Sequence, residues 1–111
     1  MLQIDNFNNI YLTRADSAEF ELTIASGEST YDFSSDLVQF TVKANTVTQD
    51  IVIQKTFVDG KIQITPTDTK DLRYTELKYD VQLITPNNEV YTVLLGDFII
   101  TEEVNFNVSY T

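Results

Sequence analysis

Apolar and polar residues alternate one by one along two stretches of this chain, residues 18–24 and 38–43. Every second position carries an aliphatic or aromatic side chain, and charged or other polar residues stand between them. Successive side chains of a β-strand point to opposite faces, so a period of two indicates a strand with one buried face and one wet face. We therefore predict a strand in each stretch.

The pair Asp59-Gly60 separates two further strand segments. The β-branched, mostly apolar segment 51–58 precedes it, and the alternating segment 61–65 follows. Both central residues of a type I′ turn need a positive φ, which Asp and Gly tolerate. We predict a two-residue β-hairpin here.

A short helical turn is expected directly after this hairpin. Thr65 can serve as its N-cap, with Pro66 at the first helical position and Asp68 three residues after the cap. This arrangement satisfies backbone N–H groups that lack partners at a helix start. The spacing predicts one or two turns that end near Leu72.

A second hairpin is predicted near the end of the chain. Residues 86–88, Pro-Asn-Asn, lie between an alternating segment, 76–85, and another apolar segment, 89–95. Gly96 and Asp97 then interrupt a run that resumes at residue 98, which we interpret as a β-bulge. The last strand is therefore expected to be long and bent.

These segments, with one more strand around 10–13, amount to about seven strands with turn signals about every 8 to 12 residues. This spacing is typical of a sandwich or a small barrel, and we favour the sandwich. The length fits one domain. We predict an all-β, immunoglobulin-like β-sandwich of about seven antiparallel strands with one short helical turn, forming a single domain over 1–111.

Composition excludes several kinds of chemistry. The 111 residues include no Cys and no His, so disulfides, Ser-His-Asp or Cys-His catalysis and ordinary zinc or copper sites are excluded. No two carboxylates show a spacing that marks a glycosidase pair. The start of the chain lacks a secretory signal, and no stretch reaches the roughly 20 apolar residues that span a bilayer. We expect cytoplasmic synthesis, no membrane insertion, no cofactor and no enzymatic activity.

The charge of -10 is unevenly distributed. Up to Leu37 there are seven acidic residues and one basic residue, residues 38–80 carry six of each, and the remainder adds four acids. Such a charge disfavours binding to nucleic acid and to anionic membranes. The acidic first third is either a solvated surface that keeps the protein soluble or an acidic face for a basic protein partner.

Tyr79 stands two residues before Val81, where antibody domains have Cys. The segments 68–72 and 77–83 are similar to the crossing between sheets in immunoglobulin-like domains. The resemblance makes Tyr79 a candidate tyrosine corner, with its hydroxyl bonded to the backbone of the turn from Asp68 to Leu72. The chain lacks the Cys and Trp of true antibody domains.

A more specific resemblance covers nearly the whole chain. The segments 12–17, 68–83 and 96–104 look like small tail and baseplate proteins of phages and prophages of Gram-positive bacteria, closest to the N-terminal domain of upper baseplate proteins. Ala15 stands where such proteins often have Gly. The resemblance implies a virion structural role in the tail, docking to other tail proteins, with no catalytic signature.

The end of the chain carries a further strand pattern. Apolar side chains alternate with polar ones from residue 104 onward. This segment either is the far end of the last strand and packs in its own domain, or it pairs between subunits of a homo-oligomer or forms the root of a following module. The candidate interface residues here are Val104, Phe106, Val108 and Tyr110.

Other candidate sites are weaker. Arg14-Ala15-Asp16 is only loosely similar to the tripeptide that integrins recognise. We prefer to interpret it as an interaction between the Arg and Asp side chains at the end of a strand. Arg14 and Asp16 are also candidate interface residues. The carboxylates of Asp68 and Asp71, together with Asp36 or Asp80, could provide oxygen ligands for calcium. The sequence has no EF-hand spacing. The alternative function is a carbohydrate-binding or cell-surface adhesion sandwich, which would need two or three exposed aromatic rings on one sheet face.

Overall fold

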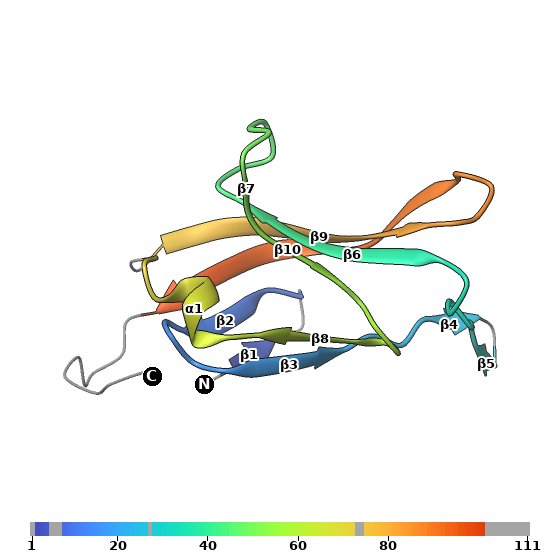
Figure 1. Ribbon diagram of the computed structural model, residues 1–111, viewed down its shortest axis with the longest axis horizontal. Helices are drawn as coiled ribbons and strands as arrows, with labels where there is room; N and C mark the ends of the chain where they lie inside the picture. The colour runs from blue at the N-terminus through green and yellow to red at the C-terminus, as the bar shows by residue number, and fades with distance from the viewer. Residues whose placement is uncertain (1, 5–7, 27, 73–74, 102–111) are drawn as a thin grey trace.

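The computed structural model describes residues 2–4, 8–26, 28–72 and 75–101 (Figure 1). Within them the chain forms ten strands and one four-residue helix. The elements are β1 (Leu2–Ile4), β2 (Ile10–Thr13), β3 (Ala18–Glu21), β4 (Ala25–Ser26), β5 (Ser29–Thr30), β6 (Leu37–Lys43), β7 (Ile51–Thr56), β8 (Lys61–Ile64), α1 (Pro66–Thr69), β9 (Thr75–Ile84) and β10 (Val90–Thr101). The prediction of an all-β chain with one short helical turn is confirmed.

The strands form a curled six-stranded sheet and two short pairs. The order in the large sheet is β1-β2-β10-β9-β6-β7, and β3 pairs with β8 while β4 pairs with β5. Figure 1 shows β3 and β8 running along one side of the molecule, with β6, β9 and β10 on the other. The buried side chains lie between these two layers.

The strand count and one pairing differ from the prediction of about seven antiparallel strands. Ten strands occur in the described ranges, and β2 runs parallel to β10, with Ile10 opposite Phe98 and Thr13 opposite Thr101. The turn after β2 passes the chain to the β3–β8 pair, so β2 and β3 belong to different sheets. The other edge of β2 pairs with β1, antiparallel.

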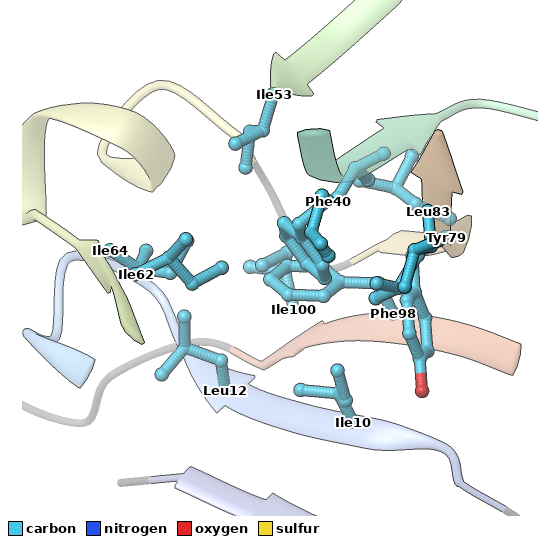
Figure 2. Packing of buried hydrophobic residues seen from close by; sticks show 14 residues of the cluster. Ile10, Leu12, Phe40, Ile53, Ile62, Ile64, Tyr79, Leu83, Phe98 and Ile100 are labelled. Atoms are coloured by element: carbon cyan, nitrogen blue, oxygen red, sulfur yellow. The ribbon is translucent and has the colours of Figure 1, made fainter. Parts of the chain in front are cut away.

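The core is built from the alternating faces of the central strands. In β6 and β9 every second side chain is buried, as the sequence period requires. Phe40 lies at the centre, with its ring centroid 5.7 Å from that of Phe20, 5.5 Å from Tyr79 and 5.9 Å from Phe98. Figure 2 shows Phe40, Tyr79 and Phe98 among buried aliphatic side chains from both layers. Burial of each such ring contributes about 1.5–3 kcal/mol to stability.

The turn predicted at Asp59-Gly60 is confirmed, but the strands on its two sides do not form the predicted hairpin, because β7 pairs with β6 and β8 with β3, and only the bridge between Val58 and Lys61 joins them. The φ values of Asp59 and Gly60 are 54° and 78°, as a type I′ turn needs. Val58 and Lys61 exchange two backbone hydrogen bonds, of 2.9 and 3.0 Å, across the turn. The strand before this turn, β7, ends at Thr56, two residues earlier than expected.

The bulge predicted at Gly96-Asp97 lies elsewhere. The register of β9 with β10 shifts between Thr92 and Leu94 and continues regularly through Gly96, which faces Tyr79. Gly96 is needed for another reason. A Cβ at this position would lie 2.6 Å from the carbonyl oxygen of Asn8, too close for any side chain. The loop before β2 therefore packs directly on the backbone of β10.

Candidate protein-docking site

The molecule has two ends of different character, separated along its longest axis (Figure 1). At the end that we call the helical end, the turn 14–17 meets α1. At the end that we call the open end, the loop 31–36 and the turn 57–60 lie near the start of β6. The sequence-predicted residues Arg14 and Asp16 lie at the helical end.

The turn after β2 is held to α1 by a buried hydrogen bond. The backbone N–H of Ala15 donates to Oγ1 of Thr69 at 2.8 Å, and both residues are buried, with 3% and 0% of their surface exposed. Ala15 has φ 65°, in the left-handed region that favours glycine. An unpaired N–H here would cost about 1–3 kcal/mol.

Arg14 adds a second connection between the same two elements. Its guanidinium donates to the backbone carbonyl of Lys70, and its own backbone N–H donates to the carbonyl of Thr101 at 2.7 Å. The N–H of Asp16 donates to the carbonyl of Thr13 at 3.1 Å. A side-chain tie between Arg14 and Asp16 stays a prediction. The chain thus leaves β10 beside this turn, at the helical end.

The candidate interface residues of the C-terminal segment lie outside the described residues, so their role stays a prediction. The set comprises Val104, Phe106, Val108 and Tyr110. The structure does show where β10, the strand before this segment, ends. Because Thr101 bonds to Arg14, the segment starts at the helical end.

Asp68 caps α1 as the sequence predicted. Its Oδ2 accepts from the backbone N–H of Thr65 at 2.7 Å, and the ammonium of Lys55 lies 2.9 Å away. Burial raises the pKa of the Asp68 carboxyl, but the Thr65 hydrogen bond and the Lys55 charge outweigh it, and the pKa is lowered. The carboxylate is therefore ionised and partnered at neutral pH.

The carboxylates weighed as possible calcium ligands do not form one cluster in the described part of the chain. Asp68 binds Lys55, and Asp36 accepts from the Tyr31 hydroxyl at 2.7 Å at the open end. Asp80 lies on the outward face of β9, where burial raises its pKa although Lys43 lowers it. Within the ranges that the structure describes, no three acidic side chains gather as metal ligands would.

Tyr79 is buried, as expected, but its hydroxyl has a different partner. It donates to the backbone carbonyl of Asn8, which is also the group that excludes a side chain from position 96. The predicted partner was the turn that ends at Leu72. Leu72 instead donates its N–H to the carbonyl of Thr69 at 2.9 Å and packs at the edge of the core. Tyr79 thus holds the loop before β2, rather than the turn after α1.

The most distinctive feature of the open end is an acidic hollow of about 480 Å³. Part of its lining is apolar and comes from Leu22, Phe33, Val38 and Phe57. Its carboxylates are Glu21, Asp32, Asp36 and Asp59, and no Lys or Arg is among the described residues that line it. The first three carboxylates come from the acidic first third of the chain, and the Asp59-Gly60 turn supplies the fourth.

Two of these carboxylates accept hydrogen bonds within the loop 31–36. Asp32 accepts from the backbone N–H of Ser34 at 3.0 Å, and this bond lowers the pKa of the carboxyl. Asp36 accepts from Tyr31, and this bond is the main reason that the pKa of the phenol is raised. A hollow that is negative and partly apolar attracts a cationic group with an aliphatic stem, such as a Lys or Arg side chain.

The outward face of the large sheet has a second hollow, of about 440 Å³, with balanced charges. Lys43, Lys78, Asp80 and Asp97 all line it. Lys78 donates to Asp97, and this hydrogen bond is the main reason that the pKa of the ammonium is raised. Because opposite charges already face one another here, this surface has less attraction for a charged partner than the acidic hollow.

Sequence reasoning identified the acidic first third but not the hollow. In the sequence, Asp59 is recognisable only as a turn residue. In the structure, this turn places Asp59 in the lining of the hollow together with Glu21. The available signal was the imbalance of seven acids to one base up to Leu37. The paths of the loops decide which of these acidic residues come together. The residue pattern does not specify those paths.

Comparisons with known proteins leave the function open. Family models, curated proteins and solved structures all give no match to this chain. In the described part of the chain, no helix has the length and apolar character needed to cross a bilayer. Function therefore has to be inferred from the chemistry of the chain itself.

Proposed function

We propose that this chain is a non-enzymatic, protein-binding structural module of a phage or prophage tail or baseplate, which docks to other tail proteins in the virion. The acidic hollow is the observation that carries this proposal. Its described lining combines four carboxylates, no Lys or Arg, and apolar side chains, which suits a basic side chain of a protein partner. No cofactor is needed for this role.

The strand order supports an immunoglobulin-like sandwich, the fold that the resemblance implies. Assigning β3, β6, β7, β8, β9 and β10 as strands B, C, C′, E, F and G places G, F, C and C′ in one sheet and B with E in the other. Variable-type immunoglobulin domains have this distribution. Such domains commonly act in recognition, but fold alone does not determine function.

The backbone conformation of Ala15 also supports the resemblance to baseplate proteins. Its φ of 65° is one that Gly adopts readily, and the baseplate proteins of the resemblance often have Gly at this position. The anchoring of this turn on Thr69 also gives the segment a structural role. The segment Arg14-Ala15-Asp16 is therefore explained by the fold, without an adhesion function.

A direct test uses purified tail proteins encoded by the genes beside that of this chain. We expect one of them to bind the full chain, with an affinity that falls as salt increases, because exposed charges are screened. The double variant Asp32→Asn/Asp59→Asn should weaken binding about tenfold, since it removes two charges from the hollow.

The matched control is Asp50→Asn/Asp71→Asn, which makes the same change in net charge at exposed positions outside the hollow. This control should bind within about twofold of the wild type. Equal weakening by both variants would mean that only net charge matters. Failure of every neighbouring tail protein to bind would reject the tail function.

One observation favours the alternative, a carbohydrate-binding sandwich. Tyr31 and Tyr91 are exposed, at 38% and 51%. Both hydroxyls already donate to carboxylates, Asp36 and Glu89. Binding to a glycan array that is lost in Tyr31→Ala and Tyr91→Ala would favour this alternative over protein docking.

A further inference from the structure

We propose that the edge of β3 that faces away from β8 binds an extended segment of another protein as an added β-strand, in which basic residues alternate with apolar ones. In the described part of the chain, β3 and β8 form a sheet of only two strands, so β3 keeps one free edge. This edge is a second interaction surface beside the acidic hollow, and the proposal goes beyond the function proposed above.

The register of β3 with β8 shows which residues present backbone hydrogen-bonding groups at the free edge. Directly after β3, the N–H of Leu22 donates to the carbonyl of Gly60 at 2.8 Å, so these opposed residues are a hydrogen-bonded pair of the antiparallel ladder. Such pairs alternate with pairs whose N–H and C=O groups point outward. Glu19 and Glu21 are three positions and one position before Leu22, so their backbone groups point away from β8.

The bonding of β8 agrees with this alternation. Lys61, opposite Glu21, exchanges two backbone hydrogen bonds with Val58, on the side away from β3. Gln63, opposite Glu19, points the same way by the same rule. Among the residues that the structure describes, no second strand pairs with Glu19 and Glu21. Each of these two residues therefore offers one backbone donor and one backbone acceptor to an added strand.

The core-facing side chains of β3 and β8 differ in burial. Ile62 and Ile64 of β8 are buried, with 4% and 1% of their surface exposed. Phe20 and Ala18, directly opposite them, are only half-buried. The ring of Phe20 stacks on that of Phe40 in the core, so Phe20 does face inward. The core is therefore well covered beside β8 and less covered beside the free edge of β3.

A small hollow of about 160 Å³ with a mainly apolar lining lies between the two layers beside β3. Its lining includes Phe20, Leu22, Leu94 of β10 and Ile4 of β1. Ile4 lies opposite the buried Ile10 and so faces inward, yet it is 54% exposed. A hollow of this size accepts one apolar side chain, since a cavity of roughly 150 Å³ holds a benzene molecule. A strand added to β3 would direct every second side chain toward this layer of the core.

The outward side chains of β3 select the chemistry of the added strand. Glu19 and Glu21 alternate with Phe20 and are exposed, and Lys61 approaches Glu19 only to 3.7 Å at the surface. Basic residues fit opposite these carboxylates, and apolar residues fit opposite Phe20. Pairing with β3 of a second copy is disfavoured, because four carboxylates would meet across the two strands. The occupant is therefore a strand of another protein in which Lys or Arg alternates with Val, Ile or Leu.

The test uses three synthetic peptides of equal length: alternating Lys and Val, alternating Lys and Ser, and the sequence of residues 104–110, which alternates apolar with uncharged polar residues. Each is titrated into the full-length, isotope-labelled chain, and binding is followed by NMR. We expect the Lys/Val peptide to bind at least about fivefold more tightly than Lys/Ser, because burial of even one apolar side chain has that effect. It should also bind more tightly than the 104–110 peptide, which lacks basic residues.

Hydrogen exchange identifies the edge that the peptide occupies. With saturating Lys/Val peptide, the amide protons of Glu19 and Glu21 should exchange at least about tenfold more slowly, because they gain acceptors. Gln63 at the free edge of β8 is the internal control and should not change. Methylation of the peptide nitrogens at every Lys, or at every Val instead, should abolish binding in only one of the two forms, because alternate N–H groups of an added strand point toward β3.

Two charge variants separate this edge from the acidic hollow, because Glu21 also lines the hollow. Glu19→Gln/Glu21→Gln should weaken binding of the Lys/Val peptide about fivefold, since two cross-strand charge pairs are lost. The control Asp32→Asn/Asp59→Asn makes the same change in net charge within the hollow and should bind the peptide within about twofold of the wild type.

Several results would overturn the proposal. Equal weakening by the two charge variants would mean that the peptide senses net charge or occupies the hollow. Binding of the 104–110 peptide as tight as that of Lys/Val would make the chain's own sequence the better occupant of the edge. Unchanged exchange at Glu19 and Glu21 would leave these glutamates as charges that only prevent edge-to-edge association. The docking function of the acidic hollow would survive each result, because it is tested separately with neighbouring tail proteins.

Discussion

The helical end and the open end differ in how their polar groups are used. At the helical end, backbone and side-chain groups bond to one another inside the fold, as in the Ala15 N–H to Thr69 contact. At the open end, carboxylates line a hollow that contains no described counter-charge. A polar group that is buried must be paired, whereas an exposed one remains available to a partner. We therefore expect substitutions at the helical end to affect stability most, and substitutions at the open end to affect the proposed recognition.

Ala15→Val should produce the largest loss of stability. Valine is strained at the left-handed conformation, and its extra methyl groups overpack a buried site, so we expect a cost of about 3 kcal/mol. Asn88 has nearly the same φ, 64°, but is exposed. Asn88→Val should therefore cost only the strain, about 1–2 kcal/mol. Urea denaturation, followed by circular dichroism, measures the loss of unfolding free energy in both variants. Equal losses would show that position 15 is not tightly packed.

Thr69→Val should rank second. The shape of the side chain is kept, but the buried N–H of Ala15 loses its acceptor, at a cost of about 2 kcal/mol. The control Thr67→Val changes an exposed residue of the same helix. We expect little effect there in the same urea experiment. A similar loss in both variants would attribute the effect to helix propensity rather than to the buried hydrogen bond.

Asp68→Asn should cost about 1 kcal/mol at neutral pH, because the capping carboxylate and its contact with Lys55 are weakened. The folded-state pKa of Asp68 is lowered. The stabilisation is therefore present above the unfolded-state pKa, about 3.9, and disappears as the pH falls through the folded-state value. The difference between wild type and variant, measured by urea denaturation across acidic pH, should shrink accordingly. A constant difference would show that charge is not the cause.

Asp36→Asn at the open end should have the smallest effect, with no measurable change in the free energy of unfolding. Its consequence should be spectroscopic. The Asp36 carboxylate raises the pKa of the Tyr31 phenol, so the variant should lower it toward the ordinary value. Absorbance of ionised phenol at alkaline pH reports this shift, and Tyr31→Phe identifies the titrating ring. A large loss of stability in Asp36→Asn would break the distinction between the two ends.

Local residue patterns determined much of the fold. The alternation of β6 and β9, the positive φ pair at Asp59-Gly60 and the capping of α1 by Asp68 all follow from interactions within a few residues. These features were predictable because a strand period, a turn type or a helix cap depends on neighbours along the chain. The absence of His and Cys likewise excludes whole classes of chemistry through composition alone.

Only the tertiary structure decided which distant residues meet. Tyr79 bonds to Asn8, 71 positions away, instead of the turn near Leu72, and the same approach explains Gly96. The parallel pairing of β2 with β10 and the convergence of Glu21 with Asp59 are also long-range. A residue pattern states what a side chain needs, such as burial or a hydrogen bond. It does not state which remote segment supplies it, because that depends on how the two layers pack.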